Sequence, residues 1–252
     1  MPILTFLSDF GLYEHYVAVV KAKILSVLPQ QPIIDISHQV QLGNIVQAAY
    51  LLKSIYSELP EGSVHLVAVG SAYNNSHLLI EYKKQFFIGP DNGIFSLCFE
   101  NEEDINCYKI GDDLPDSFPV KNIYVDVALS LLNGEEIKHP IYDDYQRKIT
   151  RKPVCYQTEI TGHVVYVEQN GNLITNIDKA FFLEKTEGKK YSIRFEYEKF
   201  NELSTGYNDA EYGDCIVFFN SNDLLEIAIN HGNASQLLGM KYDSPINIVL
   251  ND

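Results

Sequence analysis

The chain has 252 residues and carries 34 acidic against 19 basic side chains, a formal net charge of -15. Because nucleic-acid backbones and anionic membranes need basic surface on a partner, this balance argues against both classes of partner. Hydrophobic residues make up 46% and charged residues 21% of the chain, ordinary values for a globular protein with a well-buried core.

The first half of the chain alternates predicted strands with predicted helices. The helices rest on apolar residues at helical spacing, such as Val17, Val20 and Ile24. In chain order we predict a strand at 3–7, a helix at 13–28, a strand at 33–36, a helix at 44–55, strands at 64–69, 78–82 and 85–88, and a helix at 125–132. This order predicts an α/β domain with a largely parallel sheet.

The texture of the sequence changes in the second half. Residues 135–158 are polar and Tyr-rich, contain Pro140 and Pro153, and show no sustained period, which indicates a linker. Short β-like runs follow at 162–167, 173–177, 191–197, 215–220 and 246–250, with one short helix candidate at 233–238. We therefore predict an α/β ligand-binding domain over 1–134 and a smaller all-β, barrel-like domain over 159–252.

Ser8-Asp9-Phe10-Gly11 directly follows the first predicted strand. A strand that ends in a carboxylate places Asp9 at the carboxyl edge of the sheet, where ligands bind in open α/β proteins. A carboxylate there is well suited to a vicinal diol such as a ribose. Asp9 can equally cap the next helix, and this motif alone leaves both interpretations open.

Two further motifs favour ordinary structural roles. Asp35-Ile36-Ser37-His38 resembles part of a hydrolase constellation, but catalysis by Ser and His requires groups brought together in space, and these are sequence neighbours at a strand end. Gly89-Pro90-Asp91-Asn92-Gly93 is typical of a turn whose last Gly needs a positive φ.

The chain opens without a basic segment followed by a long apolar stretch, and no window reaches the roughly 18 apolar residues of a membrane span. We therefore expect a cytoplasmic protein without a signal peptide. The four cysteines are scattered and form no CxxC pair, so neither a structural metal site nor a disulfide is expected.

Taken together, these and other segments closely resemble the S-adenosylmethionine hydroxide adenosyltransferase family, whose relatives include fluorinating and chlorinating enzymes. The resemblance covers essentially the whole chain in colinear order. Its motifs are Ser8-Asp9-Phe10-Gly11, Glu14-His15-Tyr16-Val17, Ile34-Asp35-Ile36-Ser37-His38, Ala48-Ala49-Tyr50, Pro60-Glu61-Gly62-Ser63-Val64-His65, Gly89-Pro90-Asp91-Asn92-Gly93, Gly171-Asn172-Leu173-Ile174-Thr175-Asn176-Ile177 and Asn220-Ser221 running into Leu225-Glu226-Ile227-Ala228.

The resemblance implies a homotrimer that binds S-adenosylmethionine, or its adenosyl product, between subunits and needs no other cofactor. By the same resemblance Asp9 holds the ribose hydroxyls, Asn172 reads adenine, Glu168 binds the methionine ammonium and Ser221 contacts its carboxylate. Family members carry Asp where this chain has Glu168, and a stacking aromatic residue where it has Asn170. Loss of an aromatic–base stack costs about 1–3 kcal/mol if nothing else covers that face.

The resemblance fails at the residues with which hydrolytic members activate water, an Asp, an Arg and a His. The corresponding positions here are Gly70, His77 and Pro119, and the Ser of the halogenating relatives corresponds to Val120. His77 can serve as a replacement base, because an unperturbed His titrates near neutral pH, or it is simply a surface or strand-start histidine.

Two turn-like segments complete the candidate ligand residues. Tyr73 and Asn92 are expected to line the nucleotide pocket, although turn chemistry alone also explains them. Two functional hypotheses follow. The first is an enzyme that binds S-adenosylmethionine and substitutes at the ribose C5′, most simply by hydrolysis to adenosine and methionine. The second is a binding or sensing module that recognises an adenosyl ligand without turnover.

Overall fold

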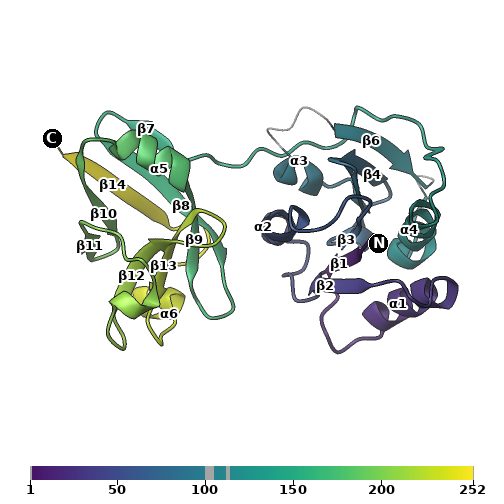
Figure 1. The fold of residues 1–252 in the computed structure, drawn as a ribbon, viewed down its shortest axis with the longest axis horizontal. Helices are drawn as coiled ribbons and strands as arrows, with labels where there is room; N and C mark the ends of the chain where they lie inside the picture. The colour runs from purple at the N-terminus through teal and green to yellow at the C-terminus, as the bar shows by residue number, and fades with distance from the viewer. Residues whose placement is uncertain (1, 100–104, 112–113, 252) are drawn as a thin grey trace. The chain divides into compact units, whose positions relative to one another are not determined.

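The computed structural model describes residues 2–99, 105–111 and 114–251. The chain divides into two compact units, residues 1–149 and 150–252 (Figure 1). Each unit has a hydrophobic core of its own. None of the helices in the described ranges has both the length and the apolarity needed to cross a membrane.

The first unit is built on a six-stranded mixed sheet in the order β2-β1-β3-β5-β4-β6. Strands β2, β1, β3 and β5 run parallel, whereas β4 lies antiparallel between β5 and β6. The bounds are β1 Leu4–Ser8, β2 Ile33–Ser37, β3 Val64–Ala68, β4 His77–Tyr82, β5 Gln85–Pro90 and β6 Ile105–Ile110. Lys83 and Lys84 both have positive φ and close β4 and β5 into a hairpin, which is why this end of the sheet is antiparallel.

Helices cover both faces of this sheet (Figure 1). Buried residues of α1 and α4 share one core cluster, and those of α2 and α3 share another. The bounds are α1 Tyr16–Val27, α2 Ile45–Tyr56, α3 Ile94–Cys98 and α4 Val125–Leu132, with a 3₁₀ turn η1 at Ser71–Tyr73 and a π-helical turn η2 at Val120–Tyr124. The sheet and its helices confirm the predicted α/β class.

The second unit is an all-antiparallel, nearly barrel-shaped sheet in the order β11-β10-β14-β8-β9-β13-β12, with β7 paired to β8. The bounds are β7 Val154–Tyr156, β8 Glu159–Val167, β9 Leu173–Asp178, β10 Lys190–Phe195, β11 Glu198–Phe200, β12 Cys215–Phe219, β13 Leu224–Ile229 and β14 Pro245–Asn251, with helices α5 Lys179–Thr186 and α6 Ala234–Leu238 and a 3₁₀ turn η3 at Tyr207–Asp209. This architecture confirms the predicted smaller all-β domain.

The segment 135–158, predicted as a linker, is divided between the two units. Gln146 is held to the first unit, because its backbone N–H donates to Asp91 Oδ1 at 2.7 Å and its side chain donates to the Asp91 carbonyl at 2.7 Å. Residues 154–156 instead form β7 of the second unit.

Candidate functional site

The carboxylate of Asp9 lies directly after β1 and is held by backbone groups of two other loops. Its Oδ2 accepts hydrogen bonds from the N–H groups of Gly43 and Gly70, each at 2.9 Å. Its Oδ1 accepts no hydrogen bond from the described residues. Asp9 does not cap the next helix, which was the other interpretation of this motif, because the N-cap residue of α1 is His15. One oxygen of Asp9 is therefore fixed to the protein and the other is available to a ligand.

Asp9 borders a pocket of about 240 Å³ in the first unit. The pocket is smaller than the roughly 300–1,000 Å³ of sites that enclose a whole drug-sized ligand, so it holds only part of one. The aromatic rings of Phe10, Tyr16 and Phe118 pack against one another with centroids 5.3–5.9 Å apart and form one wall. The lining residues are Asp9, Phe10, Tyr16, Leu42, Gly70, Ser71, Ala72, Tyr73, Ser117, Phe118 and Pro119.

Two of the three positions that the sequence analysis aligned with water-activating residues line this pocket. They are Gly70 and Pro119, which the fold brings together with Asp9. Gly70 adopts φ +67°, a left-handed conformation that glycine tolerates best, and in it the Gly70 N–H reaches Asp9. The pocket edge nearest Asp9 thus carries the backbone N–H of Gly70 as a hydrogen-bond donor.

His77, the third position of that alignment, is not among the residues that line the pocket. His77 is the first residue of β4, and its side chain is fully buried, with Nδ1 2.8 Å from the Tyr124 hydroxyl. Burial raises the pKa of Tyr124 well above its ordinary value, so the Tyr124 hydroxyl stays protonated. His77 therefore begins a strand, as one interpretation of the sequence had it, but it is a core residue and not a surface one.

Of the two turn residues expected at the pocket, Tyr73 lines it, whereas Asn92 is not among its lining residues. Tyr73 ends η1 and is 76% exposed, so its ring can move against a ligand. Asn92 donates to the Val69 carbonyl at 3.0 Å and accepts from the Ile94 N–H, which anchors the turn after β5. Gly93 follows with the expected positive φ, of 91°.

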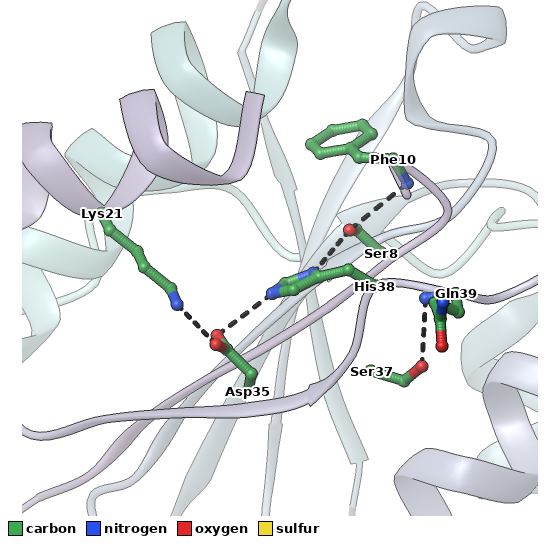
Figure 2. Close-up of polar contacts among 7 residues, drawn as sticks. All are labelled: Ser8, Phe10, Lys21, Asp35, Ser37, His38 and Gln39. Carbon is green, nitrogen blue, oxygen red and sulfur yellow. Dashed lines mark hydrogen bonds and ion pairs between the residues drawn. The ribbon is translucent and has the colours of Figure 1, made fainter. Parts of the chain in front are cut away.

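A chain of polar contacts supports the turn that carries Asp9 (Figure 2). The Ser8 hydroxyl lies 2.7 Å from His38 Nδ1 and accepts a long hydrogen bond of 3.4 Å from the Phe10 N–H. On the other side of the ring, Nε2 lies 3.1 Å from Asp35 Oδ1 without hydrogen-bond alignment, and Lys21 pairs with Asp35 Oδ2. The Ser8 hydroxyl thus forms a hydrogen bond with His38 Nδ1, and the tautomer of the ring sets which of the two groups donates.

The partner of His38 is therefore Ser8 and not its sequence neighbour Ser37, whose hydroxyl accepts from the Gln39 N–H. Burial lowers the pKa of His38, outweighing the opposing effect of Asp35, so the ring is neutral near pH 7. Ser8 has no exposed surface and does not line the pocket, which excludes it as a nucleophile there. With the bond from the Gly11 N–H to the His38 carbonyl at 2.7 Å, the network holds the turn in place.

The second unit gathers two other sequence-predicted residues around one amide. Asn172 Nδ2 donates to Glu168 Oε2 at 3.2 Å, to the Tyr207 hydroxyl at 2.6 Å and to Glu226 Oε1 at 2.9 Å. The tight turn from Glu168 places Asn172, and its Gly171 has φ +90° with Asn233 atoms where a Cβ would lie. The fold thus brings Asn172 and Glu168 within hydrogen-bond distance of each other.

Ser221 lies in the turn between β12 and β13 and is exposed. The neighbouring Asn220 organises this turn by accepting backbone hydrogen bonds from Asn222 and Leu224. Its side chain also contributes to the environment of Glu226. Ser221 is therefore one residue from a side chain that reaches the Asn172 cluster.

A larger open hollow of about 610 Å³ on the second unit contains none of the predicted site residues. The acids at its edge serve their own loops, since Asp209 accepts from the Thr205 N–H and Asp214 from the Glu211 N–H. Despite its volume, it lacks the convergent polar groups expected of a small-molecule site.

The sequence did not single out the aromatic wall or Glu226 as site residues. Phe10, Tyr16 and Phe118 lie far apart in sequence and only the fold assembles their rings. Glu226 could have been found from the sequence, because it is a single carboxylate inside the apolar run of β13. Burial of a carboxylate is energetically unfavourable, so one in such a run indicates a specific role.

Comparison with known protein families gives two matches in the order of the two units. The model of the SAM hydroxide adenosyltransferase N-terminal domain matches residues 4–140. The model of the SAM hydroxide adenosyltransferase C-terminal domain matches residues 162–247.

Individual relatives align with this chain over nearly the whole length of both proteins. A protein of Methanocaldococcus jannaschii named (R)-S-adenosyl-L-methionine hydrolase is 29% identical, over 99% of this chain and 96% of its own. One of Thermus thermophilus with the same name is 26% identical, over 97% and 98%. The solved structure of an uncharacterized conserved protein from Thermotoga maritima superposes with a TM-score of 0.87 at 30% identity, covering 98% of this chain and 100% of that one.

Proposed function

The chain belongs to the SAM hydroxide adenosyltransferase family, and from this premise we propose that it binds S-adenosylmethionine and catalyses nucleophilic substitution at the ribose C5′, most simply hydrolysis to adenosine and methionine. Relatives that match over almost their whole length bear the name of S-adenosylmethionine hydrolase, which supports the substrate class.

The observation that carries the proposal is the state of the Asp9 carboxylate. Its Oδ2 is already saturated by the N–H groups of Gly43 and Gly70, so Oδ1 is held in one orientation at the pocket edge. A carboxylate oxygen fixed in this way accepts charge-assisted hydrogen bonds from the ribose hydroxyls without first giving up another partner.

The reaction itself makes modest demands on the protein. The bond between the ribose C5′ and the sulfonium sulfur breaks and releases neutral methionine, so the leaving group needs no acid. The protein must mainly place the nucleophile in line and partly desolvate it. The aromatic wall of Phe10, Tyr16 and Phe118 supplies an apolar surface for this purpose. Among the described lining residues only Asp9, Tyr16 and Tyr73 are ionisable, so water has no His or Arg beside it here.

That feature is also the specific reason to keep the second hypothesis, a module that binds the adenosyl ligand without turnover. With Gly70 and Pro119 at the pocket, activation of water depends on a group outside its lining. His77 stays a candidate for this role, and it requires that water reach a fully buried ring.

A thermal-shift titration combined with a product assay tests the proposal. S-adenosylmethionine and adenosine should each raise the melting temperature, and release of adenosine and methionine from S-adenosylmethionine identifies an enzyme. Stabilisation without adenosine release identifies the binding module. If neither compound shifts the melting temperature, both hypotheses are wrong.

We further propose that the protein is a homotrimer that binds its ligand between subunits, as its family resemblance implies, and that Glu168, Asn172 and Ser221 contact the ligand. Light scattering coupled to size-exclusion chromatography measures the mass directly. A mass equal to one chain of 28.6 kDa contradicts both the trimer and a ligand site between subunits.

A further inference from the structure

The amide nitrogen of Asn172 has more acceptors around it than it has hydrogens. Nδ2 lies within hydrogen-bond distance of Glu226 Oε1, the Tyr207 hydroxyl and Glu168 Oε2, whereas a primary amide carries two hydrogens. None of the described residues donates to Asn172 Oδ1. The whole donor capacity of this side chain is therefore directed into the protein, and only its acceptor is available to a ligand.

Charge decides this orientation of the amide. Rotating the group by half a turn would place the Asn172 carbonyl oxygen against the Glu226 carboxylate, and two oxygens of negative character repel each other strongly where water is scarce. Asn and Gln orientations follow from such networks, and here the network allows one.

Glu226 is a carboxylate buried within a strand. It lies in the middle of β13, between Leu225 and Ile227, and is 5% exposed. Asn172 donates to it at 2.9 Å and the Tyr207 hydroxyl at 3.4 Å. Burial, and after it the Glu168 carboxylate, raises the pKa of Glu226, so the strand holds this acid at a cost.

We propose that Glu226 is a positioning residue that sets the hydrogen-bond polarity of base recognition, because it turns the Asn172 amide so that its carbonyl oxygen faces the ligand. Since this rests on the proposed function, the ligand is a purine nucleoside. A carbonyl oxygen accepts a hydrogen bond from the 6-amino group of adenine and repels the 6-oxo group of hypoxanthine. The site therefore distinguishes adenosine from inosine.

Titration calorimetry with adenosine and inosine as probes tests this role. The unchanged protein should bind adenosine about 10- to 100-fold more tightly, the range expected when a hydrogen bond is replaced by two opposed acceptors. Glu226→Met removes the acceptor while keeping the length of the side chain, and the preference should fall at least about fivefold. Glu226→Gln, the matched control, still offers a carbonyl oxygen to Asn172 and should retain most of the preference.

A purely structural role for Glu226 gives a different result. It weakens binding of both nucleosides together and leaves their ratio unchanged, so a Glu226→Met variant that keeps the full preference overturns the proposal. Equal affinity of the unchanged protein for the two nucleosides also overturns it and leaves the proposed function standing. Binding of neither nucleoside overturns both.

A measurement on the unchanged protein covers the case in which Glu226→Met does not fold. In ¹⁵N-labelled protein the side-chain NH₂ signals of Asn172 should exchange slowly with solvent, because both hydrogens point at Glu226, Tyr207 and Glu168. With ¹⁵N-labelled adenosine added, no hydrogen-bond coupling should appear between the Asn172 side-chain nitrogen and a nitrogen of the base. Such a coupling would mean that the NH₂ group itself contacts the base, which contradicts the proposal.

Discussion

Replacing Asp9 by Asn tests the ribose contact while sparing the fold. In the native protein Oδ2 accepts from the backbone of Gly43 and Gly70 at 2.9 Å, and the Asn side chain can offer its carbonyl oxygen to the same two donors. The NH₂ group then occupies the place of Oδ1 at the pocket edge. The substitution therefore removes the negative charge from the ligand side and leaves the protein side paired.

The magnitude follows from the difference between charged and neutral hydrogen bonds. A hydrogen bond to a charged group stabilises by about 1.5–3 kcal/mol and a neutral one by about 0.5–1.5 kcal/mol. Over two ribose hydroxyls the loss is about 2–3 kcal/mol, which is roughly a 30- to 150-fold increase in the Kd for adenosine. Asp9→Ala, which also leaves the N–H groups of Gly43 and Gly70 without this acceptor, should abolish binding and lower the melting temperature.

Titration calorimetry with adenosine gives the Kd, and a thermal melt of each variant checks the fold. The matched control is Glu61→Gln, which removes one negative charge at an exposed position paired with the exposed Lys84. It should leave the Kd unchanged. If Asp9→Asn binds adenosine as tightly as the unchanged protein, Asp9 does not hold the ribose and the assignment of this pocket is wrong.

Two buried histidines give the remaining predictions. Burial lowers the pKa of His65 from 6.5 to about 4, so between these pH values the unfolded chain gains a proton at His65 and the folded chain does not. The free energy of unfolding should therefore fall by about 3 kcal/mol as the pH drops from 6.5 to about 4. Urea unfolding of His65→Gln should show a shallower pH dependence. An identical pH dependence in the two proteins would contradict this. His77→Ala should cost about 2–4 kcal/mol of stability, because it leaves a cavity and removes the partner of the buried Tyr124 hydroxyl, yet adenosine affinity should be unchanged. Adenosine release from S-adenosylmethionine should drop more in His77→Ala than in the matched Tyr124→Phe only if His77 is the base.

Much of the fold was predictable because most helices and strands have a local pattern of apolar residues with the matching period. The strand at 33–36 and the helix at 44–55 appear within a residue or so of the expected bounds, the helix being capped by Asn44 as its sequence favours. The predicted helix at 13–28 begins only at Tyr16, since no side chain caps its first turn. Strands β6 and β13 were not predicted, because polar residues such as Asn106 and Glu226 interrupt their apolar pattern.

The site was predictable only where a short motif carries it. Asp9 stands out because it ends a buried strand, whereas Asn172 and Glu168 were named only through the family resemblance. The aromatic wall could not be foreseen, because Phe10 and Phe118 are distant in sequence and meet only after α1 and the loop before η2 have packed. His77 shows the opposite case, in which a polar residue at a strand start turns out to be core.

The sequence by itself determined the two-part α/β and all-β organisation, the family, and the residue at the end of β1 that could meet a ribose. These depend on local periodicity and on residue types at fixed spacing. Only the tertiary structure decided which oxygen of Asp9 is available, that His38 pairs with Ser8, and that Glu226 turns the Asn172 amide. Hydrogen-bond direction depends on which groups from distant segments share a buried space, and no local pattern contains that information.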